Sequence, residues 1–181
     1  MGQKADEKQF NIGTNHRLNR PLLAHPKGCE MKIYIQITPE KIRAKKIAGL
    51  GMTDWIEEFP WIAFESENKK NIKAYGEEAL AFSKGNTNII TASNPFQDMK
   101  TWADDESLVI KYLVWFFSKR IAKNLILRPT VILQPMGYGE TLNAVEKRII
   151  TETFTFAGAR KVYLIETTDE LSDLDLRNKI Y

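Results

Sequence analysis

Few side chains in this chain of 181 residues have the chemistry of a reactive site. The two histidines, His16 and His25, have no second ligand at coordination spacing, so neither indicates a metal site. The single cysteine, Cys29, cannot form an intrachain disulfide and lacks the partners of a zinc or CxxC motif. Unpaired cysteine usage favours a reducing compartment, so we expect a cytoplasmic protein without a bound metal.

Two pairs of residues have spacings that are typical of a phosphate-binding loop and of a helix start, respectively. Gly137 and Gly139 form a G-x-G pattern, in which glycine lets the backbone approach a phosphate, although a lone G-x-G does not identify a phosphate site. Asn143 and Glu146 form a capping-box pattern, because each side chain can accept a backbone N–H from the other residue. A helix is therefore expected to begin at Asn143.

The residues around these groups predict a strand, a helix and a second strand. The apolar run 130–134 is typical of a buried strand, the helix runs from Asn143 towards Gly158, and a further strand fits 161–165. A strand, helix and strand within about 35 residues form a βαβ unit, whose two strands are parallel.

The chain before this unit predicts antiparallel strands. Alternation over 32–37 is typical of a strand with one buried face, and 41–48 reads as its return strand. Further strands are expected at 61–64 and 71–75, followed by a brief helix that ends near Gly85. Residues 86–103 show no regular pattern. The fold class is therefore α/β, with a mixed sheet that opens with antiparallel strands.

A long helix is predicted between Leu108 and Ile121, with Asp104 or Asp105 as its N-cap. Apolar residues cover nearly all of its surface, which is typical of a helix buried between other elements. We therefore expect it to be the central packing element of the domain.

Composition excludes several functions. The formal net charge of +3 comes from nearly balanced basic and acidic residues. The sequence has no dense Lys/Arg patch of the kind that binds nucleic acid. No apolar run reaches 18 residues, so a transmembrane helix is not expected, and no signal peptide is visible at the N-terminus. Residues 1–31 are interpreted as a flexible tail and 167–181 as an acidic C-terminal segment.

Several segments, in the same order, resemble the MreB-like bacterial actins, the rod shape-determining proteins. The most specific are N-A-V-E-K-R from Asn143 and A-G-A-R-K-V-Y-L-I-E from Ala157; Y-G-E-E-A-L from Tyr75 and N-P-F-Q-D from Asn94 are also similar. The resemblance spans about 32–166, the first half of such a protein. It implies an actin-like ATPase domain of ribonuclease H-like fold, domain I, with a smaller inserted subdomain at about 66–104.

The chain departs from this family where its members hold phosphate. The family's first hairpin carries an aspartate near the metal and small residues, but here Tyr34 or its neighbour replaces the aspartate and Gln36 replaces the glycine. Pro39 lacks an N–H and Glu40 adds negative charge, so the turn at Thr38 makes a poor phosphate site. About four extra residues also lie between Pro135 and Asn143.

The resemblance matches Glu146 to the glutamate that positions the attacking water in an ATPase. The same residue is explained without catalysis as the capping-box partner of Asn143, and we favour that interpretation. We therefore expect no catalytic residue and no cofactor. The alternative is ATP with magnesium, bound through Thr38, Gly137 and Gly139 with Glu146 as the catalytic residue.

Three hypotheses about function follow. The favoured one is a non-catalytic module that binds a protein partner or self-associates, with Trp55, Phe59 and Trp61 as candidate partner-binding residues. The second is an ATP-binding or ATP-hydrolysing protein that works as a fragment or with a partner chain. The third, a nuclease of the ribonuclease H-like kind, needs an acidic residue on the first strand, and that strand has none.

Overall fold

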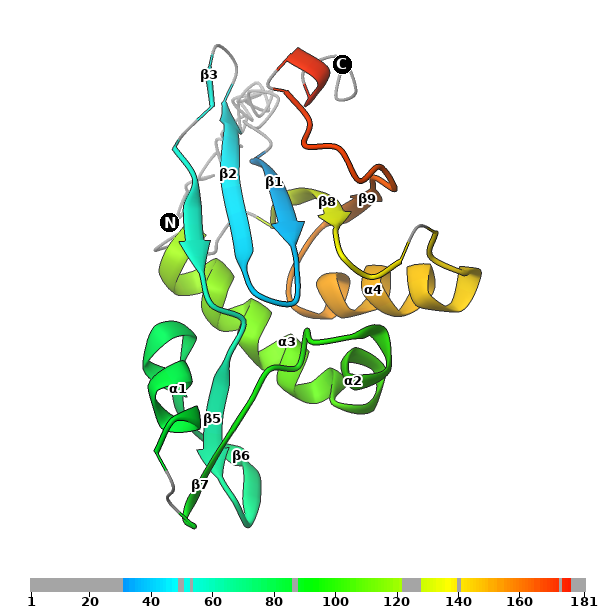
Figure 1. Cartoon of the computed structure of the whole chain (residues 1–181). Coiled ribbons are helices and arrows are strands. Elements are labelled where there is room, and N and C mark those ends of the chain that lie inside the picture. The colour runs from blue at the N-terminus through cyan, green and yellow to red at the C-terminus, as the bar shows by residue number, and fades with distance from the viewer. Residues whose placement is uncertain are drawn as a thin grey trace, which may run out of the picture.

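The computed structural model describes residues 31–48, 51–52, 54–85, 88–121, 128–139, 141–172 and 174–176. Of the expected N-terminal tail, only Met31 lies among them. Two sheets with helices packed against them make up the fold, so the expected α/β class with a mixed sheet is confirmed (Figure 1).

The larger sheet has the strand order β3-β2-β1-β8-β9, with β4 also paired to β2. The β1–β2 pair is antiparallel, whereas β1–β8 and β8–β9 are parallel, as the βαβ pattern predicts. The strands are β1 (Lys32–Ile37), β2 (Ile42–Ala48), β3 (Gly51–Met52), β4 (Ile56–Glu58), β8 (Thr130–Pro135) and β9 (Lys161–Leu164).

One face of this sheet packs against α3 (Glu106–Trp115) and α4 (Ala144–Phe156). Ile33, Ile35 and Ile37 of β1 lie on that face, and Val131 and Leu133 of β8 extend it. Fully buried aromatic residues of the helices, including Tyr112 of α3 and Phe154 of α4, complete the main hydrophobic core.

The opposite face of β1 is also buried, which differs from the expected single buried face. Tyr34 is fully buried and Gln36 is 2% exposed, because β1 lies between β2 and β8 and the segment after β9 crosses this face. Leu176, in a short helical turn of the acidic C-terminal segment, is fully buried beside Tyr34 and Ile132. The acidic segment therefore contributes to a second, smaller core.

The smaller sheet has the order β6-β5-β7, with both strand pairs antiparallel. Its strands are β5 (Ile62–Glu65), β6 (Asn68–Tyr75) and β7 (Ile90–Ser93), and α1 (Gly76–Ser83) packs against it. Helix α1 ends near Gly85 as expected, with Lys84 as its C-cap, and Gly85 does not have the positive φ typical of a glycine cap.

The expectation of irregular structure over 86–103 was wrong. It contains β7, which is held by pairing to β5, and α2 (Met99–Asp104). The Asp98 side chain caps α2 by accepting the Thr101 N–H at 2.6 Å, which also lowers the pKa of Asp98.

The expected long helix is present as α3 and a π-helical continuation over Phe116–Ile121. Asp105 precedes α3 as expected, but its side chain makes no capping bond and instead lies 2.6 Å from Lys69 Nζ. α3 runs between the two sheets (Figure 1), with Leu113 in the main core and Leu108 packed against β5. Because it contacts both sheets, α3 is the central packing element.

Candidate functional site

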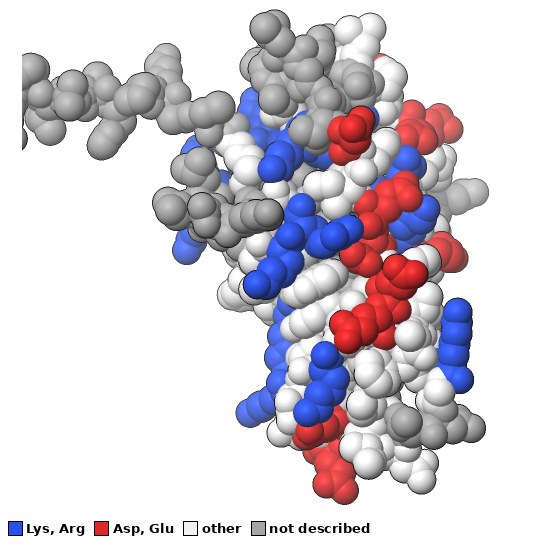
Figure 2. All heavy atoms as spheres, turned by 90° about the vertical axis from the view of Figure 1, so that its left-hand side faces the viewer, with Lys and Arg blue, Asp and Glu red and all other residues white. Residues whose placement is uncertain are grey.

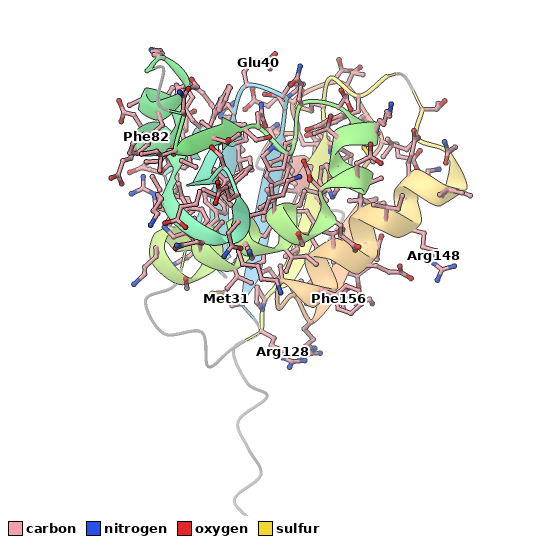
Figure 3. All side chains as sticks on the ribbon, turned by 90° about the horizontal axis from the view of Figure 1, so that it is seen from below. Met31, Glu40, Phe82, Arg128, Arg148 and Phe156 are labelled. Carbon is pink, nitrogen blue, oxygen red and sulfur yellow. The ribbon has the colours of Figure 1, made fainter. Side chains whose placement is uncertain are left out.

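The loops after β1 and β8 lie at the same edge of the larger sheet, because these strands are parallel and in register from Lys32–Thr130 to Ile37–Pro135. Seen from below, Glu40 marks this edge, and Met31 and Arg128 lie at the opposite end (Figure 3). The predicted phosphate-binding alternative required these two loops to meet, and the structure brings them together.

The Thr38 turn satisfies its own backbone donors. Thr38 Oγ1 accepts the N–H groups of Glu40 at 3.2 Å and Lys41 at 3.0 Å, and Thr38 N–H donates to Lys41 O. Pro39 has no N–H to offer. The turn therefore presents no free backbone donor from residues 38–41 to a phosphate.

Gly137 and Gly139 both have positive φ, at 83° and 103°. A Cβ on Gly137 would lie 3.2 Å from Pro39 Cδ, so glycine allows the two loops to approach each other. Between the glycines, the hydroxyl of Tyr138 donates to Phe96 O at 2.7 Å, and burial raises the Tyr138 pKa well above its usual range. The loop is thus fastened to the protein interior.

The cavity beside this loop is very small. Pro135, Gly139, Leu142 and the segment Glu166–Thr168 line it together with Tyr138, and its volume is about 10 Å³. That is roughly the space of one water molecule, whereas small-molecule sites usually have volumes of about 300–1,000 Å³.

Glu146 takes part in the predicted capping box. Its Oε2 accepts the Asn143 N–H at 2.8 Å, and Asn143 Oδ1 accepts the N–H groups of Val145 at 2.9 Å and Glu146 at 3.0 Å. The capping box is confirmed, and it engages the same carboxylate that the catalytic interpretation would use.

A buried polar network, which was not predicted from the sequence, lies beneath this edge. Gln36 Nε2 donates to the Tyr34 hydroxyl at 3.0 Å and to Gln134 Oε1 at 3.2 Å, and the Tyr34 hydroxyl also donates to Gln134. The signal was a glutamine near the end of each of two neighbouring parallel strands, both at most 2% exposed.

Gln134 also holds the segment that follows β9. Its Nε2 donates to Thr167 O at 2.6 Å and to Asp169 O at 2.8 Å. These bonds fasten the acidic segment across the ends of β1 and β8, so the polar groups at this edge bind the chain itself.

The three aromatic candidates for partner binding lie in different surroundings. Trp55 packs against Tyr34, and its ring is 4.2 Å from the Arg43 guanidinium and 4.5 Å from Lys45 Nζ. Trp61 packs beside the alanine cluster of the smaller sheet. Phe59 is 38% exposed. They therefore do not form one aromatic patch.

Among the described residues, no group of three or more His, Cys, Asp or Glu side chains is placed to hold a metal ion. His16, His25 and Cys29 lie outside those residues. Within the same part of the chain, no helix has both the length and the apolar character needed to cross a membrane.

Comparisons of sequence give no relative: no protein-family model matches the chain, and no curated protein matches it significantly. Comparison of structures does give matches. MreB5 of Spiroplasma citri bound to ADP superposes with a TM-score of 0.53 at 16% identity, and MreB5 bound to AMPPNP superposes with 0.51 at 18% identity. Each match covers 75% of this chain but only 38% of the MreB5 chain. The fold of this chain is therefore an MreB-like actin fold, over well under half the length of those proteins.

Proposed function

We propose that this chain is a non-catalytic MreB-like actin-fold domain that acts in the cytoplasm as a protein-interaction or assembly module, related to the bacterial cell-shape cytoskeleton. The observation that supports this most strongly is the Thr38 turn, whose N–H groups bond within the turn. An actin-like nucleotide site needs such groups for phosphate.

The other residues at this edge also fit ATP and magnesium poorly. β1 carries Tyr34 and Gln36 in place of a carboxylate, and both side chains are engaged in the buried network. Glu40 and the segment from Glu166 to Glu170 add negative charge close to where polyphosphate would lie. The donor set therefore suits neither a polyphosphate nor its metal.

The alternative is an ATP-binding actin-like half-site that works with a partner chain. Two observations favour it: the positive φ of Gly137 and Gly139, and the place of Glu146 at the start of α4. The similar MreB5 structures are bound to ADP and AMPPNP.

Replacing Glu146 by glutamine separates these functions. Glutamine keeps the capping-box geometry, so the free energy of unfolding is expected to stay within about 0.5 kcal/mol of wild type. Neither protein is expected to release phosphate from MgATP. The measurements are urea unfolding and a phosphate-release assay, with Asn143→Ala as a control that loses about 1 kcal/mol. Hydrolysis by wild type that Glu146→Gln abolishes would contradict the proposal.

A further inference from the structure

A second hollow, of about 350 Å³, lies between the two sheets and far larger than the cavity beside Tyr138. The β1–β2 turn, β4, the end of β6, the first turn of α1 and the end of the helix that continues α3 all contribute to its lining. Its volume is at the lower end of the range of about 300–1,000 Å³ that is usual for small-molecule sites.

The lining of this hollow is acidic. Four glutamates and two cations, Lys41 and Arg120, line it, so its formal charge is −2. On this face of the protein, acidic side chains gather in a band across the middle, and basic side chains flank the band (Figure 2). The hollow should therefore attract a cation.

The two β4 carboxylates are already engaged within the protein. Glu58 Oε2 lies 3.1 Å from Arg120 Nε, and Glu58 Oε1 accepts the N–H groups of Phe59 and Glu77 at 3.3 Å. Glu57 pairs with Lys41 at 2.8 Å and with Arg43 at 2.9 Å. These bonds hold Glu57 and Glu58 in place and pair both cations that line the hollow, Lys41 and Arg120.

The other two carboxylates, of Glu77 and Glu78, are exposed in the first turn of α1. Among the described residues, no Lys or Arg lies within ion-pair distance of either one. Acidic residues at a helix N-terminus do stabilise the helix, but that role does not account for the hollow or for its aromatic lining.

Two aromatic residues line the same hollow as these carboxylates. Phe59 is 38% exposed, and Tyr75 is held in place by stacking on Trp115, with ring centroids 4.9 Å apart and an interplanar angle of 7°. Aromatic faces and carboxylates both attract guanidinium and ammonium groups. Such a combination suits a basic side chain better than an anion or a neutral ligand.

We propose that this hollow binds a lysine- or arginine-bearing segment of a protein partner, with the cationic side chain between Glu77, Glu78 and Phe59. This inference rests on the proposed function, because it gives the interaction module a binding site and its partner a charge. Of the three aromatic residues expected to bind a partner, only Phe59 lines the hollow.

The test uses the full chain without nucleotide and a fluorescein-labelled peptide of alternating serine and arginine, followed by fluorescence anisotropy. We expect this peptide to bind more tightly than one with glutamate in place of arginine, and more weakly at higher salt. Glu77→Gln with Glu78→Gln should weaken binding about tenfold, and Phe59→Ala about two- to fivefold.

The matched control is Glu65→Gln with Glu67→Gln, which removes the same charge from residues that do not line this hollow. It should leave the affinity within about twofold of wild type, and circular dichroism should show that all variants keep their helices. Equal weakening by both double variants, or no preference for the basic peptide, would overturn the proposal.

Light scattering of the same proteins tests the choice of occupant. If the chain self-associates and Glu77→Gln with Glu78→Gln abolishes this, the hollow binds a second copy of the chain. That result would overturn the proposal that a different protein binds there. Because no nucleotide is present, failure of peptide binding leaves the non-catalytic assignment standing. Conversely, ATP hydrolysis by a protein that still prefers the basic peptide would contradict the non-catalytic assignment but not the proposed binding of a basic segment.

Discussion

Replacing Leu113 by alanine is expected to lower the free energy of unfolding by about 2–5 kcal/mol. Leu113 is fully buried in α3, among the side chains that join this helix to the larger sheet and α4. Truncation leaves a cavity in a part of the core that two elements hold in place, so the surroundings can relax only partly. Urea unfolding followed by circular dichroism measures the loss.

Val114→Ala is the matched control on the same helix, because Val114 is 43% exposed and lies outside the core cluster. Its free energy of unfolding should change by no more than about 0.5 kcal/mol. If both variants unfold at the same urea concentration as wild type, α3 is not the central packing element of the fold.

Replacing Gly76 by alanine is expected to cost about 1–3 kcal/mol. Gly76 has a φ of 67°, and a Cβ would lie 2.4 Å from Glu58 Oε1. The backbone cannot shift freely, because Gly76 N–H donates to Trp61 O at 2.9 Å. The substitution therefore combines left-handed strain with displacement of the Glu58 carboxylate from the start of α1. Thermal and urea unfolding measure the effect.

Gly85→Ala gives the opposite expectation at the other end of α1. Gly85 does not have a positive φ, and the nearest atom to a Cβ there is Phe82 O at 3.9 Å. Alanine at such a position restricts mainly the unfolded chain, so stability should stay equal or rise by up to about 1 kcal/mol. Equal losses at Gly76 and Gly85 would show that neither the left-handed backbone of Gly76 nor its close approach to Glu58 makes that position more sensitive.

The hairpin and the βαβ unit could be predicted because local patterns encode them. Alternation in β1, the apolar run in β8 and the capping box at Asn143 each depend on residues close together in the chain. Local patterns do not report which strand becomes central. The burial of Tyr34 and Gln36 depends on β8 and on the segment after β9, which are far away in sequence.

The other features of the candidate sites also depend on contacts between residues that are far apart in the sequence. The network joins Tyr34 to Gln134, and Gln134 to Thr167 and Asp169, across long stretches of sequence. The acidic hollow likewise combines Lys41 with residues of β4, α1 and the end of the α3 continuation. β7 was missed because four residues between turns carry too little periodicity, and its pairing with β5 decides its structure.

Titration of the full chain with MgATP and MgADP, followed by isothermal calorimetry and thermal unfolding, is the most direct test of whether the protein binds nucleotide. A ligand present at 100 times its dissociation constant stabilises a folded protein by about 2.7 kcal/mol, which is several degrees for a chain of this size. Because the backbone N–H groups of the Thr38 turn are bonded within the turn, we predict no saturable heat of binding at millimolar nucleotide. We also predict no shift of the unfolding temperature beyond that caused by magnesium alone. Saturable binding with a matching rise in unfolding temperature would show that the protein binds nucleotide and would overturn the proposed non-catalytic function.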